Sequence, residues 1–350
     1  MLAIALVLTS ACEKGAAWEP ELRMVKDIYG ISRLLPRTVS RVACLDVLCY
    51  STLLMLGQTD KIVAMQVNAG RTPWVSRVRP PEGLQLLGAS PSTELLMSQR
   101  VDVVIGGYGG EREAAAFARA GLRQVRAQAI GVKAATAEEF VESQKRMVRV
   151  FADVLSGTAP DKAEDWCRWY DATVARVRSR TQTLPSRERP RAYFVRGPSV
   201  LATHGKGAYV YWYGEMAGAD MVVKDKRAAG DIGVEDLIRW NPEIMLIGRQ
   251  YPASLALDDP RLREIRAVRE RRVLEVPAGV FFWDGGPECG LLLLYLAKHL
   301  HPDLFPELDL AFEVKDYYRR FYRTDLSGEE VDLLLRGLGP DGQRRNPFGI

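Results

Sequence analysis

The alternation of apolar and polar positions along the chain predicts short strands and helices in turn. Continuous apolar stretches ended by glycine, such as VDVVIGG at 101–107, are typical of strands buried on both faces. The stretches 92–100 and 111–121 carry apolar residues at helical spacing, and Ser92 or Thr93 is placed to cap the first of them. Strands that alternate with helices at this spacing predict an α/β layer with a mostly parallel sheet.

Two long helices are predicted in the middle of the chain. The stretches 136–157 and 159–185 keep apolar residues at helical spacing throughout, and Thr136 and Pro160 are suitable start signals. The second stretch would form roughly 35 Å of helix at 1.5 Å per residue. A rigid element of this length can cross one domain and reach into the next.

The strand and helix rhythm restarts at RAYFV, residues 191–195, and continues to about residue 277. A strongly apolar helix is then predicted at 290–302, and the stretch 314–338 reads as two helices. The pattern therefore predicts two α/β lobes, a helical connector between them and a helical C-terminus.

The N-terminus, MLAIALVLTSAC, is an apolar run of about eleven residues, well short of the roughly 20 needed to span a bilayer. Because small residues precede Cys12 and a polar sequence follows, the segment resembles a bacterial lipoprotein signal in which Cys12 is lipidated. Thr9 stands where leucine is usual, and no basic residues precede the apolar run. The alternative is an apolar tail with an incidental cysteine.

Composition excludes some classes of protein. The chain is 47% hydrophobic and 26% charged, which is ordinary for a soluble globular protein, and its net charge is only +4. No stretch concentrates Lys and Arg as a nucleic-acid interface would. Cys44 and Cys49 are interpreted as lying within or beside one apolar strand, where a local disulfide is not expected, so buried free cysteines are predicted.

The motifs of common enzymes are missing from the sequence. There is no G-x-S-x-G, no G-x-x-x-x-G-K-[ST] and no H-E-x-x-H, so we predict no catalytic residues and no enzyme activity. The three histidines are His204, His299 and His301, and the first lobe has none. A closed zinc or manganese site built from several histidines is therefore hard to assemble.

Four separated stretches within residues 37–336 resemble the class III periplasmic substrate-binding proteins of ABC importers. They are SRVACLDVLCYSTLLMLGQTDKIVAM, then STELLMSQRVDVVIG, then YGEMAGADMVV with GVEDLIRWNPEIMLIG, and finally VFFWDGGPECGLLLLYLAKHLHPDLFPELD. In the second stretch Arg100 and Val101 replace the lysine and proline of the family pattern. The four stretches occur in the family's order and spacing.

The resemblance implies two Rossmann-like lobes with parallel-type sheets, joined by one long rigid connecting helix, with the ligand cleft between them. It also implies delivery of a ferric siderophore, haem, corrinoid or related metal-bearing cofactor to an ABC permease and its ATPase, by a monomer without an intrinsic cofactor. Glu94 and Glu235 match the family positions, one in each lobe, whose carboxylates dock onto the permease. With the N-terminus, this organisation assigns residues 1–12 to a signal peptide, 13–36 to a linker or N-terminal segment, 37–158 to the first lobe, 159–185 to the connector and 186–340 to the second lobe.

Aromatic and arginine side chains follow many of the predicted strands, where ligands of open parallel sheets bind. The candidate ligand residues are Arg71, Trp74, Tyr108, Arg112, Arg196, His204, Tyr211, Trp212, Arg249, Tyr251, Phe282 and Trp283. Rings would stack on a flat ligand, and guanidinium groups would bind anionic chelators. The alternative for each ring is core packing, and for each arginine a solvated surface. His204 is a candidate iron ligand, with turn capping as its alternative.

The aromatic run at 209–213 cannot face the ligand as a whole. In extended backbone Tyr209, Tyr211 and Tyr213 would share one face and Trp212 would take the other. The stretch could equally open the following helix, which is predicted to start near Tyr213. Other functions stay open: a nitrogenase-like or cofactor-assembly protein, which would need cysteines lining the cleft, a surface sensor, or a binding protein for cobalamin or an oxyanion such as molybdate.

Overall fold

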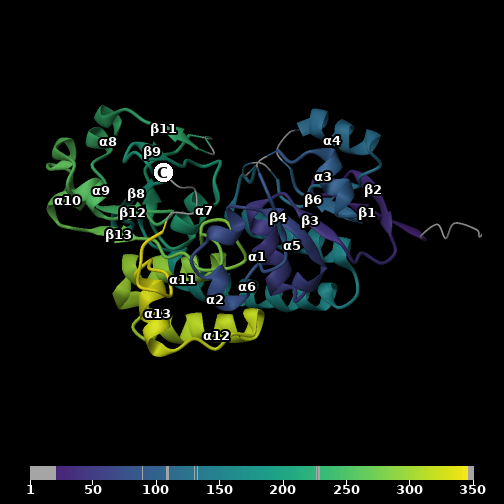
Figure 1. The fold of residues 1–350 in the computed structure, drawn as a ribbon. Helices are drawn as coiled ribbons and strands as arrows, with labels where there is room; N and C mark the ends of the chain where they lie inside the picture. Colours follow the sequence, from purple (N-terminus) through teal and green to yellow (C-terminus); the bar gives the residue numbers. More distant parts are fainter. Residues whose placement is uncertain are drawn as a thin grey trace, which may run out of the picture.

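Two α/β lobes lie side by side in the computed structural model, which describes residues 21–345 except 89, 108–109, 130, 132, 226 and 228 (Figure 1). Each lobe holds its own sheet, and a layer of long helices runs along one side of both lobes. The predicted fold class, two Rossmann-like lobes joined by a long helix, is confirmed.

The first lobe contains a five-stranded sheet in the order β5-β4-β3-β6-β7, in which every strand pair is parallel. Its strands are β3 Val42–Cys44, β4 Ile62–Gln66, β5 Gln85–Leu87, β6 Val103–Ile105 and β7 Gln124–Val125, and its helices are α1 Val47–Met55, α2 Val75–Val78, α3 Thr93–Ser98 and α4 Gly110–Arg119. The predicted cap is confirmed, because Ser92 Oγ accepts a hydrogen bond from the Leu95 amide.

The second lobe contains a mixed sheet in the order β11-β9-β8-β12-β13, with β10 also paired to β8. Its strands are β8 Arg191–Val195, β9 Ala202–Thr203, β10 Asp220–Met221, β11 Gly230–Asp231, β12 Ile244–Ile247 and β13 Val273–Glu275. Its helices are α7 Tyr209–Met216, α8 Val234–Trp240, α9 Ser254–Leu257, α10 Arg266–Arg269 and α11 Cys289–Leu300, followed by α12 Leu310–Tyr322 and α13 Gly328–Leu335. Short 3₁₀ helices are η1 Thr59–Lys61, η2 Ala69–Arg71, η3 Ser186–Glu188, η4 Pro260–Leu262 and η5 Pro302–Leu304.

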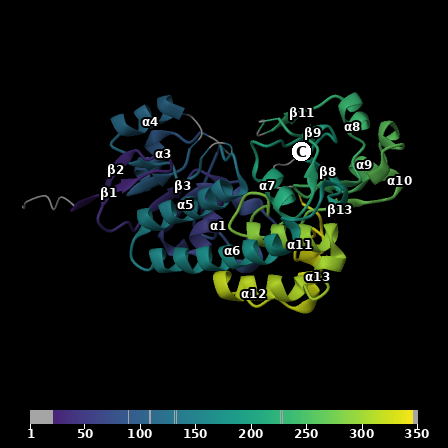
Figure 2. The same cartoon turned by 180° about the vertical axis from the view of Figure 1, so that it is seen from behind.

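The two long central helices are α5 Ala137–Leu155 and α6 Ala159–Thr181, close to their predicted bounds. Helix α6 packs on α5 of the first lobe and on α11 and α7 of the second, and Figure 2 shows it running beneath both lobes. Trp166 of α6 donates its indole N–H to the Pro287 carbonyl, and Tyr170 shares a hydrogen bond with Tyr213. The connector is therefore built into the core of both lobes.

Further contacts tie the lobes together beside the connector. Thr72 Oγ1 donates to the Val280 carbonyl at 2.7 Å, and Trp74 Nε1 donates to the Leu338 carbonyl at 3.1 Å. One hydrophobic core continues from the first sheet through α6 into α11 and α12. Continuous packing of this kind resists domain motion, so the relative placement of the lobes is largely preformed.

The predicted linker or N-terminal segment, residues 13–36, contains a hairpin in its described part. Strands β1 Leu22–Lys26 and β2 Ser32–Pro36 form an antiparallel hairpin on the outer side of the first lobe. Val25 and Leu35 are buried beneath the hairpin, and Arg23 donates to the Val154 carbonyl of α5. Residues 22–26, LRMVK, do not alternate strictly between apolar and polar, so they gave little sequence signal for a strand.

The prediction that Cys44 and Cys49 are free is wrong, because they form a disulfide with a Cα–Cα distance of 5.5 Å. Strand β3 ends at Cys44, the chain turns at Asp46, and Cys49 lies in the first turn of α1. The two residues therefore do not share a strand. Cys167 and Cys289 are buried free thiols, as predicted.

No helix in the described part of the chain is both long enough and apolar enough to cross a membrane.

Candidate functional site: a ligand cleft between the lobes

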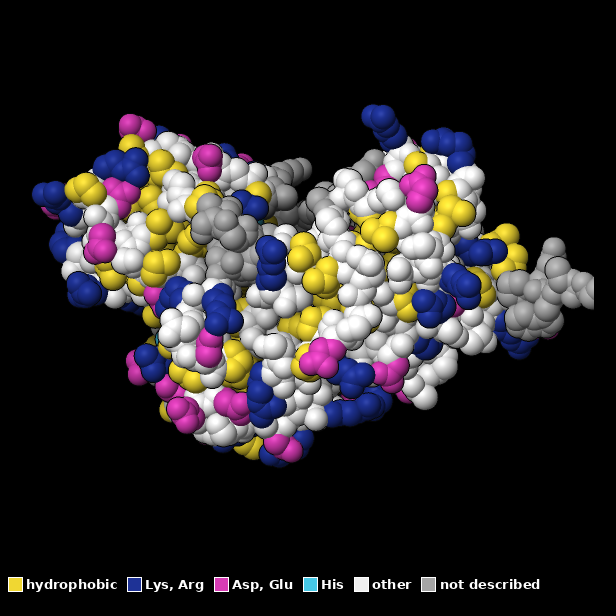
Figure 3. All heavy atoms as spheres, viewed as in Figure 1, with side chains coloured by type: hydrophobic (Ala, Val, Ile, Leu, Met, Phe, Trp, Pro, Cys, Tyr) yellow, Lys and Arg dark blue, Asp and Glu magenta, His cyan; other side chains and the backbone are white. Residues whose placement is uncertain are grey.

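A pocket of about 170 Å³ opens where strand ends of the first lobe meet helix α7 of the second. Its lining residues are Tyr29, Asp46, Gly106, Gly107, Gly110, Arg126, Gln128, Ala129, Gly131 and Tyr209, and we refer to it as the cleft pocket. The surface is indented between the two lobes on the side where α3 and α8 stand (Figures 1 and 3). The carboxyl edge of a parallel sheet is where ligands of such folds bind.

Asp46 forms one wall of the cleft pocket at the N-terminus of α1. Its side chain makes no capping bond to α1, and its Oδ1 accepts a hydrogen bond from the Gly107 amide at 3.1 Å instead. Gly106 has φ +92°, and a Cβ there would collide with the Asp46 carboxyl group. The backbone of the β6 end therefore approaches Asp46 closely because residue 106 is glycine.

Arg126 and Gln128 follow β7 and line the same pocket. Gln128 Nε2 donates to the Tyr209 hydroxyl at 3.2 Å, which joins the two lobes across the pocket. Gln128 Oε1 and Arg126 Nη2 are buried and make no hydrogen bond in the described part of the chain, although Arg126 Nη2 stands 3.5 Å from Glu111. Burial raises the pKa of Tyr209, and the negative charges of Asp46 and Asp284 raise it further, so the phenol stays protonated.

The second lobe contributes a charged cluster around His204, which follows β9. His204 is 5% exposed and stacks on Phe194 with ring centroids 5.3 Å apart. Burial lowers the pKa of His204 to about 4, with Asp284 opposing that shift and Arg249 and Arg196 adding to it. The imidazole is therefore neutral at physiological pH, and its Nδ1 has no hydrogen-bond partner among the residues described.

The backbone after β12 is strained at the same cluster. Arg249 and Gln250 have φ values of 55° and 61°, a region that non-glycine residues rarely adopt. Arg249 pairs with Asp284 at 3.3 Å and lies over Phe282, with 5.1 Å from guanidinium carbon to ring centroid. Arg249 Nε and both polar atoms of the Gln250 amide are buried without a hydrogen bond in the described structure. Strain and unpaired polar atoms together are typical of a binding site.

Several aromatic residues predicted to line the cleft lie in the core instead. Trp74 is 0% exposed and Trp283 is 1% exposed, with Trp283 packed edge-on against Tyr295. Trp212 is 5% exposed and stacks on Phe140 of α5. Because their surfaces are already covered by protein, these rings offer little area to a ligand in this structure.

The remaining predicted residues have varied environments. Arg71 and Arg112 are exposed, Arg196 is half-buried near His204, and Tyr108 falls outside the described residues. Tyr251 is half-buried and lies so close to Gly197 that a Cβ there would collide with its ring.

Tyr211 and Phe282 each have a basic side chain over the ring. Tyr211 is buried, with the Lys224 ammonium 5.7 Å from its ring centroid, and Phe282 lies under Arg249. The structure thus brings His204, Arg196, Arg249 and Phe282 together and leaves Arg71 and Arg112 apart from the cleft pocket.

The alternation proposed for residues 209–213 is wrong, because α7 begins at Tyr209 and not near Tyr213. On a helix Tyr209 and Tyr213 lie on one face, and both pack against Phe140. Tyr209 alone of these residues lines the cleft pocket. The aromatic run is therefore mostly a core helix that presents one hydroxyl to the cleft.

None of the ten residues that line the cleft pocket was in the predicted set, and five of them carry polar side chains: Tyr29, Asp46, Arg126, Gln128 and Tyr209. Asp46 and Arg126 follow the strands β3 and β7, so the rule that strand ends bind ligand applies to them. Strand β7 was not predicted because it has only two residues, of which only Val125 is apolar.

Glu94 and Glu235 both lie in the first turn of a helix, α3 in one lobe and α8 in the other, and both are exposed. Figure 1 shows these helices on the same side of the molecule, one on each flank of the cleft. Hydrogen bonds from the backbone and from Ser92 lower the pKa of Glu94. The side chain is therefore charged and accessible for a partner.

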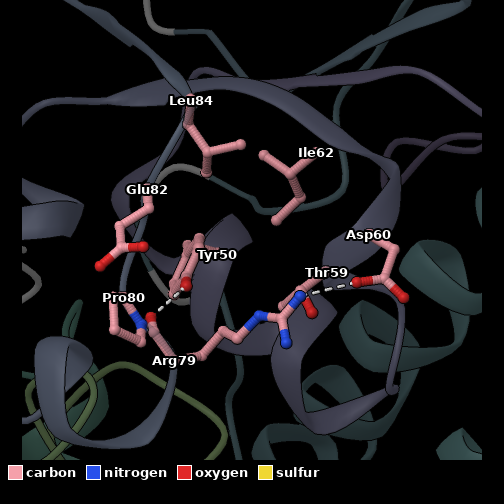
Figure 4. Close-up of a pocket in the computed structure, with 8 residues that line it drawn as sticks. All are labelled: Tyr50, Thr59, Asp60, Ile62, Arg79, Pro80, Glu82 and Leu84. Carbon is pink, nitrogen blue, oxygen red and sulfur yellow. Dashed lines mark hydrogen bonds and ion pairs between the residues drawn. The ribbon is translucent and has the colours of Figure 1, made fainter.

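A larger pocket of about 480 Å³ lies on the first lobe away from the cleft pocket (Figure 4). Tyr50 Oη donates to the Arg79 carbonyl at 2.5 Å, and the Arg79 guanidinium pairs with Asp60 at 2.8 Å. The polar groups of this pocket thus bind one another, whereas those of the cleft pocket leave buried atoms unpaired. We also find no group of three or more His, Cys, Asp or Glu arranged to hold a metal ion within the residues described.

Comparison with known proteins agrees with this geometry. One stretch of 130 residues is 33% identical to the molybdate-binding protein MolA of Haemophilus influenzae, covering 35% of this chain and 37% of MolA. The match thus spans little more than a third of that relative's length.

Solved structures share the fold at lower identity. MolA bound to molybdate has a TM-score of 0.78 at 22% identity over 87% of this chain and 99% of that one. CeuE of Helicobacter pylori in a nickel–histidine complex has a TM-score of 0.71 at 20% identity over 90% and 99%. The haem-binding protein RhuT of Roseiflexus has a TM-score of 0.57 at 19% identity over 76% and 99%.

The model of one protein family matches residues 42–279, about two thirds of the chain. The match includes the strands and helices that carry Asp46, Arg126, Gln128 and Tyr209. This chain belongs to the periplasmic binding protein family, whose members serve as solute-binding components of ABC importers.

Proposed function

We propose that this protein binds a compact, anionic, metal-bearing solute in the cleft pocket and delivers it to an ABC permease. The observation that carries the proposal is a set of buried polar atoms that make no hydrogen bond among the described residues, in the cleft pocket and in the His204 cluster of the second lobe. Gln128 Oε1 and Arg126 Nη2 come from the first lobe, and His204 Nδ1 and Arg249 Nε from the second. Leaving such groups unpaired costs about 1–3 kcal/mol each, and a ligand that binds them recovers that energy.

The character of these groups favours an anionic ligand. Arg126, Arg196 and Arg249 offer forked donors suited to carboxylate, catecholate or oxyanion groups. The pocket of about 170 Å³ is smaller than the roughly 300–1,000 Å³ sites of drug-sized ligands, so it suits a compact solute. The covered rings of Trp74, Trp212 and Trp283 leave less stacking area for haem or a corrinoid than the sequence implies.

A ferric chelate and a molybdate-type oxyanion share this chemistry, and the related proteins support both. MolA is described with molybdate and CeuE with a nickel–histidine complex, so structures of this fold hold metal-bearing solutes of small size. Neutral His204 would be suited to contact the metal of a chelate. Whether the metal is iron or molybdenum is the question for experiment.

Titration of the intrinsic tryptophan fluorescence with a panel of solutes tests the proposal. We expect saturable one-to-one binding of either a ferric siderophore or molybdate. Sulfate is the matched control, because it is an anion without a metal. Haem and cobalamin form the second arm of the panel. Tight binding of haem or cobalamin alone would reject the compact ligand, and binding of none of these solutes would reject the proposed class of cargo.

We extend the proposal to the membrane partner. Exposed Glu94 and Glu235 would dock onto basic residues of the permease, one from each lobe, and lipidated Cys12 would keep the protein at the membrane. The double variant Glu94→Ala with Glu235→Ala is expected to reduce solute uptake by cells at least tenfold while ligand affinity stays unchanged. The matched control replaces Glu264 and Glu82, which lie elsewhere on the surface. Uptake equal to wild type in the double variant would contradict the docking role.

The disulfide is expected to support the ligand site, because Cys44 and Cys49 bracket Asp46. Replacing both cysteines by alanine removes a loop constraint worth about 2 kcal/mol of unfolding free energy. We also expect ligand affinity to fall severalfold, since Asp46 then loses the covalent link between β3 and α1. Urea unfolding and the ligand titration measure the two effects, with Cys167→Ala as the thiol control. Unchanged affinity at reduced stability would limit the disulfide to a structural role.

A further inference from the structure

Exposed apolar side chains are concentrated on the β1–β2 hairpin. Of the nine large hydrophobic residues found exposed among those described, five belong to residues 22–34. They are Leu22 at 48%, Met24 at 66%, Tyr29 at 40%, Ile31 at 45% and Leu34 at 55% exposure. Clustered exposure of this kind marks a contact surface more often than scattered single residues do.

The strand register places Leu22, Met24 and Leu34 on one outer face, and Tyr29 and Ile31 belong to the turn between the two strands. Met24 pairs with Leu34, Leu22 with Pro36 and Lys26 with Ser32, and directly paired residues point to the same side of a hairpin. The opposite face carries Val25 and Leu35, which are 4% and 0% exposed. The hairpin therefore already buries its inner face, and its outer face is a second apolar surface that the fold does not use.

One basic residue of the hairpin, Lys26, lies on this outer face. Arg23 and Arg33 belong to the opposite face, and Arg33 and Arg37 pair with Asp27 and Glu21. Arg123 lies close by and lines a shallow pocket together with Arg33 and Leu34. Figure 3 shows hydrophobic and Lys or Arg side chains next to each other on the flank where Figure 1 places β1 and β2. An apolar face with basic side chains nearby complements the interface of an anionic bilayer.

The position of the hairpin in the chain brings it near a bilayer. Leu22 follows Cys12 by ten residues, and ten residues of extended backbone span at most about 35 Å. A lipid on Cys12 would thus hold the hairpin within that distance of the membrane surface. This step rests on the lipid anchor put forward under the proposed function.

We propose that the outer face of the β1–β2 hairpin rests on the anionic phospholipid surface and orients the first lobe beside the permease. Leu22, Met24, Ile31 and Leu34 would enter the headgroup region, and Lys26 would contact lipid phosphates. Each exposed apolar side chain contributes modestly, so the contact is reversible and becomes effective when the anchor keeps the protein at the bilayer. The strands of the hairpin would then be a second membrane contact, distinct from Tyr29 of its turn, which lines the cleft pocket.

Site-specific fluorescence of the full-length, lipidated protein in vesicles tests this proposal. An environment-sensitive dye is attached to the variant Met24→Cys, and the matched control carries it on Phe312→Cys, which is 63% exposed on α12. In vesicles of phosphatidylcholine with phosphatidylglycerol, we expect blue-shifted emission and quenching by spin-labelled lipids at position 24 and not at position 312. The shift should be smaller in phosphatidylcholine alone. Replacing Lys26 by glutamate should weaken it further.

Two outcomes would overturn the inference. Emission at position 24 that matches position 312 in both vesicle types would show that the hairpin stays in water. A shift that requires high protein concentration but no lipid would identify a second copy of the chain as the partner instead. The mass of the peptide containing Cys12 shows whether the lipid anchor is attached. It therefore distinguishes a protein that lacks the anchor from an anchored protein whose hairpin does not touch lipid. Ligand titration of Met24→Asp with Leu34→Asp, expected to equal wild type, separates this proposal from that for the cleft.

Discussion

Replacing Arg126 by alanine is expected to weaken ligand binding between about 10- and 100-fold. The guanidinium lines the cleft pocket with a buried Nη2 that makes no hydrogen bond among the described residues and stands 3.5 Å from exposed Glu111, a surface pair that an anionic ligand would replace. A hydrogen bond to a charged group contributes about 1.5–3 kcal/mol, which corresponds to that change in affinity. The dissociation constant from the fluorescence titration measures the effect.

The matched control is Arg112→Ala. Sequence predicts Arg112 as a ligand contact, whereas the structure places it exposed on α4 of the same lobe, outside the lining of the cleft pocket. We expect this variant to bind ligand within twofold of wild type. Arg126→Lys keeps the charge but loses the forked donor, so it should fall between the two. An equal loss of affinity in Arg112→Ala and Arg126→Ala would move the site away from the cleft pocket.

The stability of the protein is expected to fall as pH rises from about 4.5 to about 7 because of Glu288. This carboxyl group is 0% exposed, and burial raises its pKa to about 7, while hydrogen bonds from Tyr318 and the Phe281 amide oppose the shift. Below about pH 4.5 the group is protonated both folded and unfolded, so its full contribution is present. Above about pH 7 the folded protein must hold a buried charge, and on the order of 3 kcal/mol of unfolding free energy is lost.

The variant Glu288→Gln isolates this effect. The amide cannot ionise, so the free energy of unfolding in urea should vary less between pH 4.5 and 7 than that of wild type. Glu264→Gln, an exposed acid of the same lobe, should leave the wild-type profile in place. A Glu288→Gln profile parallel to wild type would show that Glu288 does not titrate in this range. Glu288 accepts a hydrogen bond from the Phe281 amide, so its charge state affects the loop from Ala278 to Asp284. This loop carries Asp284, which lies near His204.

Much of the fold could be predicted from the sequence, for identifiable reasons. Strands β4, β6 and β8 are short apolar runs bounded by polar or glycine positions, and α6 keeps its helical spacing for 23 residues. Signals of this strength depend on local sequence alone. The resemblance of four separated stretches to a known family then supplied the arrangement of the lobes, which local patterns do not contain.

The candidate site was harder to predict because its members depend on where the chain turns. Cys44 and Cys49 were assigned to one apolar stretch, whereas a turn at Asp46 brings them together and places Asp46 in the cleft pocket. Residues 209–213 allow either an extended or a helical pattern, and packing against Phe140 selects the helix. Nothing local distinguishes a core ring such as Trp283 from a cleft ring, because both follow a strand in a loop without periodicity.

The location of the bound metal would test the central claim most directly. Crystals of the protein grown with the solute that binds in the titration can be measured at the absorption edge of its metal. The account predicts one anomalous peak per chain in the cleft pocket, between Arg126 and Gln128 of the first lobe and the His204–Arg249 cluster of the second. A peak outside the cleft, or bound metal contacting neither Arg126 nor Arg249, would contradict the account.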